Sequence, residues 1–261
     1  MAALGAVGLS APVDAATVRL TVENIGTSST PVTPIFAAFH DGSYDIGQTS
    51  GTATAGLEAL AEVGNNAPIA GEFGTAGGRV SGNVGGGPIT PGSTASFDFT
   101  IDATGTSNSF LSLASMVLPS SDYIFGTVSD PGDTVFGVSL ATLFATGTQS
   151  FTLNEVYDVG TEVNDFLTSA PPIPGAAGLF TGGPFDGVLP PSAPPTGLVE
   201  GGTIQEVATP FAGFLNSPFA AGNEPNVSGL QFTLTAVPEP SMAIAGCLVM
   251  GTVVMRRRKR A

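Results

Sequence analysis

Phe97-Asp98-Phe99-Thr100-Ile101-Asp102 alternates large apolar side chains with polar ones at a strict two-residue period. Successive side chains of a β-strand point to opposite faces, so this period predicts a strand with one apolar face. Val18-Arg19-Leu20-Thr21-Val22-Glu23 repeats the pattern. Similar short strands are predicted at residues 34–40, 111–113, 151–153, 203–207 and 230–235. Such strands bury their apolar faces by pairing two sheets, which predicts an all-β fold, an antiparallel β-sandwich of about eight strands.

Three segments depart from the strand pattern. Residues 55–63 place Leu57, Leu60 and Ala61 at helical spacing before Gly64, which predicts one short helix. Residues 171–195 contain eight prolines and predict a stiffened surface loop. The glycine-rich residues 82–87 have no lysine to bind phosphate, and we expect them to form a flexible turn.

The charge of the chain is divided between an acidic body and a basic end. The 261 residues contain 21 acidic and seven basic residues, and five of the basic ones stand at residues 256–260. Residues 16–240 carry a formal charge of about −18, because they hold 20 carboxylates and only Arg19 and Arg79. Such a surface repels phosphate backbones and attracts cations, so nucleic acid is excluded as a partner.

The chain is poor in catalytic side chains. His40 is the single histidine and Cys247 the single cysteine, and no Gly-x-Ser-x-Gly motif is present. A zinc site and a Ser-His-Asp triad are therefore not predicted. We expect His40, which follows an apolar strand, to be a hydrogen-bonded structural residue. Paired carboxylates of the glycosidase kind leave no spacing signature and stay open as an alternative.

Both ends of the chain have features of targeting segments. Residues 1–16 are mostly small and apolar, and we interpret them as a signal-peptide remnant. Pro238-Glu239-Pro240 precedes an apolar run at residues 242–255 and the basic cluster at residues 256–260. This order resembles the PEP-CTERM sorting signal, which implies recognition by an exosortase-type membrane protease, removal of the tail, and a body outside the cell. An ordinary single-pass anchor is the alternative, and either reading predicts a C-terminal hydrophobic helix.

The body resembles the spondin-domain family at three places. The first is Phe39-His40-Asp41-Gly42-Ser43 followed by Gly56-Leu57-Glu58-Ala59-Leu60-Ala61-Glu62. The second is the segment at residues 112–123, which ends in Pro119-Ser120-Ser121-Asp122-Tyr123, and the third is Tyr157-Asp158-Val159-Gly160-Thr161-Glu162. Residues 17–236 are accordingly predicted to form one spondin-like β-sandwich domain, with residues 237–261 as the sorting tail.

The resemblance implies a calcium ion held by loops at one end of the sandwich. Carried over residue by residue, its ligands are Asp122, Asp158 and Glu162, with Glu162 standing where the family has Asp. Calcium needs several hard oxygen ligands from loops that can bend, and Gly160 permits such a bend. Two alternatives stay open: these acids cap turns, or Asp130, Asp133 and Asp165 replace some of them as ligands.

We therefore expect a secreted, non-enzymatic, calcium-binding module for interaction or adhesion at the cell surface or in the extracellular matrix. Its expected partners are exopolysaccharide or surface proteins, and its contact with the membrane is limited to the C-terminal tail. The alternative is a secreted carbohydrate-active enzyme with paired carboxylates. The absence of tryptophan and the presence of only three tyrosines argue against a sugar-stacking cleft.

Overall fold

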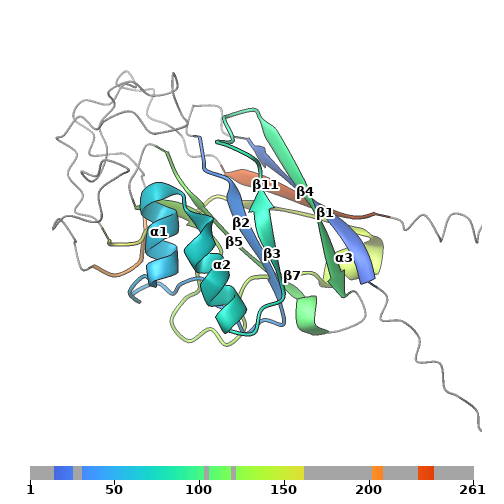
Figure 1. Ribbon diagram of the computed structural model, residues 1–261, viewed down its shortest axis with the longest axis horizontal. Helices are drawn as coiled ribbons and strands as arrows, with labels where there is room; N and C mark the ends of the chain where they lie inside the picture. Colours follow the sequence, from blue (N-terminus) through green and yellow to red (C-terminus); the bar gives the residue numbers. More distant parts are fainter. Residues whose placement is uncertain are drawn as a thin grey trace, which may run out of the picture.

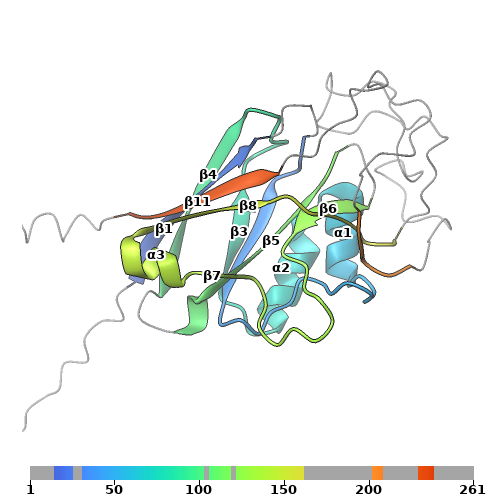
Figure 2. The same cartoon turned by 180° about the vertical axis from the view of Figure 1, so that it is seen from behind.

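Two antiparallel β-sheets form the centre of the protein (Figures 1 and 2). The computed structural model describes residues 15–25, 31–102, 106–118, 122–161, 202–207 and 229–237. The four-stranded sheet has the order β4 (Thr94–Asp102), β1 (Ala15–Asn24), β11 (Leu230–Val237), β8 (Thr148–Leu153). The seven-stranded sheet has the order β10 (Gln205–Glu206), β9 (Val156–Asp158), β6 (Tyr123–Gly126), β5 (Phe110–Met116), β2 (Ile35–His40), β3 (Val80–Val84), with β7 (Val138–Ser139) also paired to β5.

The two sheets face each other across a shared hydrophobic core. In the four-stranded sheet, Leu20 lies opposite Phe97 on one side and opposite Leu234 on the other. Leu20 and Leu234 pack in one cluster with Leu111 and Leu113 from the seven-stranded sheet. The two-residue alternation of the sequence thus assigns one face of β1 and β11 to this core and leaves the other face polar.

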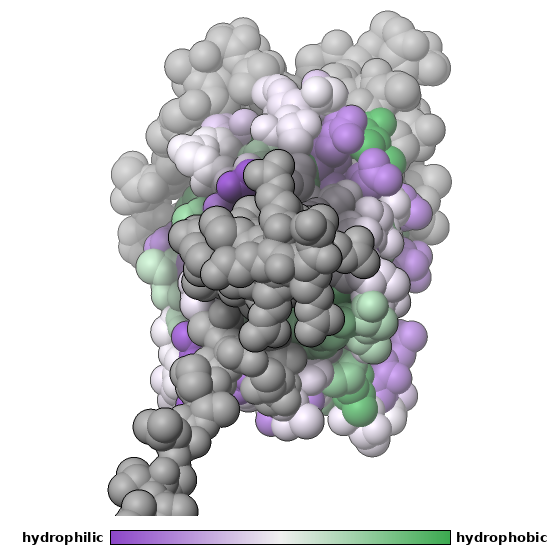
Figure 3. Space-filling view, turned by 90° about the vertical axis from the view of Figure 1, so that its right-hand side faces the viewer, coloured by the Kyte–Doolittle hydropathy of each residue, from purple (hydrophilic) through white to green (hydrophobic). Residues whose placement is uncertain are grey.

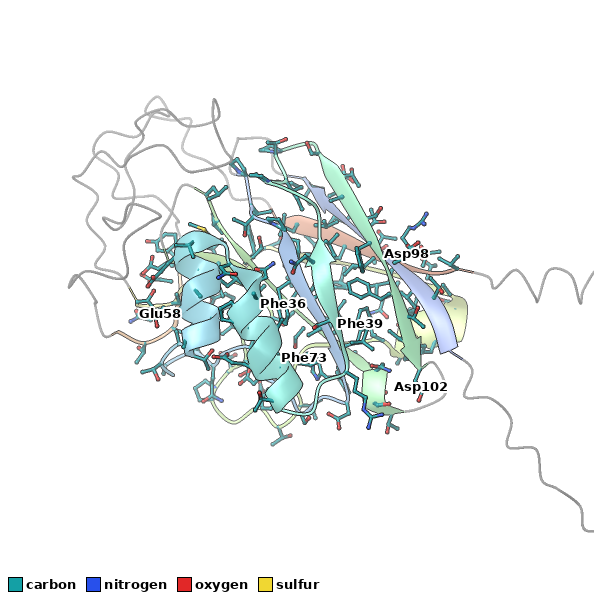
Figure 4. The ribbon with its side chains drawn as sticks, in the orientation of Figure 1. Phe36, Phe39, Glu58, Phe73, Asp98 and Asp102 are labelled. Atoms are coloured by element: carbon teal, nitrogen blue, oxygen red, sulfur yellow. The ribbon has the colours of Figure 1, made fainter. Side chains whose placement is uncertain are left out.

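Two helices cover the other face of the seven-stranded sheet. Helix α1 (Ala55–Val63) and helix α2 (Asn66–Thr75) lie over β2 and β5 in Figure 1. Phe36 of β2 and Phe73 of α2 meet edge to face, with ring centroids 6.4 Å apart, as their labelled side chains in Figure 4 illustrate. This second core is also buried, and its further members include Leu57, Leu60, Ile69, Ile124, Tyr157, Val159 and Ile204.

The prediction of a mainly β fold with two antiparallel sheets is confirmed, but the predicted counts of strands and helices are wrong. The described residues form eleven strands and three α-helices, the third being α3 (Ala141–Thr146), besides a single 3-10 turn at Thr106–Asn108. The helix predicted at residues 55–63 matches α1, and Gly64 ends it at φ 66°. Helix α2 escaped prediction because its sequence contains Pro68, Gly71 and Gly74, of which the proline is tolerated in the first turn.

Two further expectations fail in the seven-stranded sheet. Ser112, between Leu111 and Leu113, was expected on the polar side of a half-buried strand, yet it is completely buried in β5, as is Ser115. The expectation of a flexible turn at residues 82–87 is wrong for residues 82–84, which belong to β3 and pair with β2. Gly82 suits this place because an added Cβ would lie 3.0 Å from Phe99 in the opposite sheet.

Several predictions lie outside the described residues. They are the signal-peptide remnant except its last two residues, the proline-rich loop at residues 171–195, the sorting motif Pro238, Glu239 and Pro240, and the C-terminal hydrophobic helix. Strand β1 begins at Ala15, within the segment assigned to the signal peptide. Among the helices of the described residues, none has the length and apolar character needed to cross a membrane.

Candidate functional site

Asp122 and Asp158 lie at adjacent ends of two neighbouring strands of the seven-stranded sheet. Asp158 is the last residue of β9, and Asp122 immediately precedes β6. The two strands are antiparallel, with Tyr123 opposite Asp158. The N–H of Val159 donates to the carbonyl oxygen of Asp122 at 3.1 Å. The two acidic residues that the resemblance singles out are therefore neighbours in space, although they are far apart in the sequence.

The turn after β9 is fixed by its own hydrogen bonds. The Oδ1 atom of Asp158 accepts a 2.8 Å hydrogen bond from the N–H of Gly160, which closes a local turn. Gly160 has φ 67°, and its carbonyl oxygen accepts a bond from Gly202 at 2.9 Å. An added Cβ at Gly160 would lie 2.8 Å from the carbonyl carbon of Gly202. Glycine is thus required here both by the backbone angle and by the close approach of residues 202–203.

The same turn is anchored in the core beneath the helices. Val159 is completely buried, as is Ile204, and both belong to the cluster that packs between the sheet and α1. The N–H of Ile204 donates to the carbonyl oxygen of Gly51 at 2.8 Å. The backbone around Asp158 is consequently held from both sides, which limits how far its carboxylate can move.

The oxygen atoms around this turn have the chemistry of a hard-cation site. Asp122 is completely buried and Asp158 is half-buried. The Oγ1 atom of Thr161, three residues after Asp158, is buried. Among the described residues it has no hydrogen-bond partner. Removing a carboxylate from water costs free energy unless hydrogen bonds or a cation offset the loss, and Ca²⁺ prefers such carboxylate, carbonyl and hydroxyl oxygens. The residues present therefore fit a calcium ion in kind.

The third predicted ligand, Glu162, lies outside the described residues, as does Asp165. Within the described part of the chain, no group of three or more His, Cys, Asp or Glu side chains is gathered closely enough to hold a metal ion. Of the candidate ligands, the described part of the chain therefore contains Asp122, Asp158 and Thr161. Thr161 was part of the quoted sequence motif but received no role there, because a single threonine in a turn carries no ligand signal.

Asp130 and Asp133, the other acids considered, belong to a separate turn that is closed on itself. The N–H of Asp130 donates to Oδ2 of Asp133 at 3.0 Å, and Thr49 donates its hydroxyl to Oδ1 of Asp130 at 3.0 Å. Asp130 and Asp133 thus close a turn, and the bond from Gly160 to Asp158 is of the kind that the turn-capping alternative describes for Asp158. Next to them, Ser129 donates its hydroxyl to Oδ2 of Asp45 at 2.8 Å. Burial raises the pKa of Asp45 above its ordinary value, against the opposing effect of the hydrogen bonds from Ser129 and Gly47.

His40 is a buried, hydrogen-bonded residue, in line with the structural role expected for it. Its Nδ1 atom accepts from the N–H of Gly42 at 3.0 Å, so the ring proton is on Nε2, which donates to the hydroxyl of Ser112 at 2.8 Å. Its ring also stacks on Phe110 with centroids 6.3 Å apart. Burial lowers the pKa of His40 to about 4, against a smaller opposing effect of Asp41. The histidine is therefore neutral near pH 7 and is closed off from solvent.

Comparison with known proteins adds no family assignment. No protein-family model matches the chain, and no curated protein sequence matches it.

Proposed function

We propose that this protein is a calcium-dependent interaction module of the bacterial cell surface, with Asp122 and Asp158 holding the ion at one end of a two-sheet fold. The single observation that supports this most is the hydrogen bond from Val159 to Asp122, which keeps the two acidic residues on adjacent strand ends. Spondin-type ancestry is part of the same proposal. In it, Glu162 and the hydroxyl of Thr161 complete the ligand set with backbone oxygens and water.

The charge of the molecule supports a role for a cation. Among the described residues, Arg19 and Arg79 carry the basic charge, and Arg19 is already paired with Asp98. An acidic body of this kind repels other acidic polymers, and a bound divalent ion reduces that repulsion locally. Calcium therefore has two roles in the proposal: it stabilises the turns at the end of the sheet, and it permits contact with acidic partners such as exopolysaccharide.

The proposed route to the surface uses the two ends of the chain. The export segment is residues 1–16, and the sorting signal is Pro238-Glu239-Pro240 with the apolar and basic residues that follow it. An exosortase-type protease is the proposed transient partner of this tail. The mature body is then residues 17–236, retained outside the cell without catalytic turnover.

Thermal unfolding of the full chain in a mild detergent tests the role of calcium. A ligand that binds only the folded state at ten times its dissociation constant adds about 1.4 kcal/mol to the free energy of unfolding. We expect calcium to raise Tm and a chelator to reverse the rise, whereas magnesium at the same concentration has a smaller effect.

Retention of the protein on washed cells tests the surface role, because a chelator should release the protein from the cells. An identical Tm with calcium and with chelator would refute the proposal.

A further inference from the structure

Strand β4 is the open edge of the four-stranded sheet. In the described part of the chain, β1 is the one strand that pairs with it, and β4 forms the margin of this sheet in Figure 1. It contains nine residues and no proline, lysine or arginine. Natural edge strands usually carry such residues or bulges because an unprotected edge pairs with other strands. Among the described residues, no strand pairs with the outer edge of β4, and Asp98 and Asp102 are its charged residues.

The register shows which residues present that ladder. Asn24 lies opposite Ser93, and its N–H donates to the carbonyl oxygen of Ser93 at 3.1 Å. Backbone groups alternate in direction along a strand, so every second residue of β4 bonds to β1 and the others face outward. The residues of β4 whose backbone groups bond to β1 are Ala95, Phe97, Phe99 and Ile101. Among residues 94–100, the outward-facing backbone groups belong to Thr94, Ser96, Asp98 and Thr100.

Phe97 marks the centre of this edge. It lies opposite the buried Leu20 and contacts the ring of Phe99 at 4.8 Å, yet 46% of it is exposed. It is one of five large apolar residues exposed in the described part of the chain. In the view of Figure 3, the hydrophobic surface lies in small patches among hydrophilic residues. Phe97 is thus an exposed aromatic ring at the margin of the core, in a position that a strand added to β4 would cover.

We infer that a second copy of this chain pairs with β4 in an antiparallel, two-fold symmetric manner centred on Phe97. In this register Phe97 faces Phe97 of the other copy, and each Ser96 lies opposite an Asp98. Thr94 lies opposite Thr100. Since Phe97 bonds to β1 within its own sheet, the central pair is of the non-hydrogen-bonded type, in which side chains lie closest, and the neighbouring pairs supply the intermolecular hydrogen bonds.

The charges on the edge are compatible with self-association. No acidic residue of β4 faces another acidic residue in this register, since each Asp98 lies opposite Ser96 and each Asp102 lies opposite Gly92. Asp98 is also neutralised within its own copy by Arg19, whose Nε and Nη2 atoms donate to the two carboxylate oxygens at 2.7 and 2.8 Å. Figure 4 shows Asp98 on β4, where the strand forms the margin of the sheet. A shifted register that places Asp98 opposite Asp98 of the second copy would bring the two Arg19–Asp98 ion pairs together. Such a register is disfavoured because like charges directly opposite each other destabilise a strand pair.

Sedimentation equilibrium of the full chain in a mild detergent tests the inference. We expect a monomer–dimer equilibrium whose dissociation constant rises at least tenfold in Phe97→Asp. Phe144→Asp, a change of another exposed phenylalanine on α3, is the matched control and should leave the constant within twofold. Circular dichroism of both variants checks that they remain folded. A monomer at all concentrations, or a dimer that Phe97→Asp leaves unchanged, overturns the inference.

Disulfide trapping tests the register without weakening the strand ladder. The Cα atoms of a non-hydrogen-bonded pair lie about 4.5 Å apart, within the range that a disulfide spans. In a Cys247→Ser background, Phe97→Cys should form a covalent dimer under mild oxidation. Thr148→Cys, on the opposite edge strand β8, should not. Equal crosslinking of the two variants contradicts pairing through β4.

Discussion

Val159 donates its backbone N–H to the carbonyl oxygen of Asp122 at 3.1 Å and thereby joins the start of β6 to the turn that follows β9. The bond is made by backbone groups alone. The pairing of β6 with β9 therefore positions the two acidic residues of the proposed site.

The turn after Asp158 requires glycine at position 160. Gly160→Ala should lower the free energy of unfolding by more than the 1–2 kcal/mol or so that a left-handed backbone alone costs, because its Cβ meets Gly202. Gly92→Ala is the control, since Gly92 has φ 74° and no neighbour within 4 Å of an added Cβ. Urea denaturation measures the free energy of unfolding of both variants. Equal losses in the two variants would show that residues 202–203 do not constrain the turn.

The burial of His40 makes stability depend on pH in a defined window. Its pKa is about 4 in the folded chain and about 6.5 in the unfolded chain, so only the unfolded chain binds a proton between these values. The contribution of His40 is fully present above pH 6.5 and is lost as the pH falls toward 4, with an upper limit of about 3 kcal/mol. We expect His40→Gln to have a flatter dependence of unfolding free energy on pH in this window. Parallel curves for the two proteins would contradict the assignment.

Glu72 connects the two helices that cover the seven-stranded sheet. Its carboxylate oxygens accept 2.7 Å hydrogen bonds from the N–H of Gly56 and the hydroxyl of Thr54, at the start of α1. Glu72→Ala should lower the free energy of unfolding by about 2 kcal/mol, since both bonds are to a charged acceptor. Glu58→Ala removes a carboxylate from the first turn of α1 itself and should cost less than about 1 kcal/mol. A smaller loss for Glu72→Ala than for Glu58→Ala in chemical denaturation would be incompatible with this role.

The sequence predicted strands of both kinds, but it misassigned side chains to the solvent face where both faces of a strand are buried, as in β5. Strands β1 and β11 show the alternation because one face meets the core and the other meets solvent. In β5 the alternation is misleading, since Ser112 and Ser115 are buried polar residues that bond to His40 and to Thr33. In the sequence, a serine that is buried and hydrogen-bonded cannot be told from a serine that faces solvent. The packing of α1 and α2 over the sheet determines which of the two occurs.

The family resemblance named Asp122 and Asp158 and implied that loops at one end of the sandwich bring them together. The pairing of β6 with β9 places their backbones side by side. The contribution of Thr161 and the close approach of residues 202–203 to Gly160 depend on tertiary contacts that no local pattern encodes. Short strands such as β7 and β9 escape prediction for the same reason, because neighbouring strands, and not their own residues, define them.

Isothermal titration of calcium into the full chain tests the central claim most directly. We predict saturable binding of calcium, in the sub-millimolar to millimolar range typical of extracellular modules, with strong weakening in both Asp122→Asn and Asp158→Asn. Asp133→Asn, in the separate acidic turn, should bind as the parent protein does. No saturable calcium heat in the parent protein, or unchanged binding in Asp122→Asn and Asp158→Asn variants that remain folded, would contradict the account.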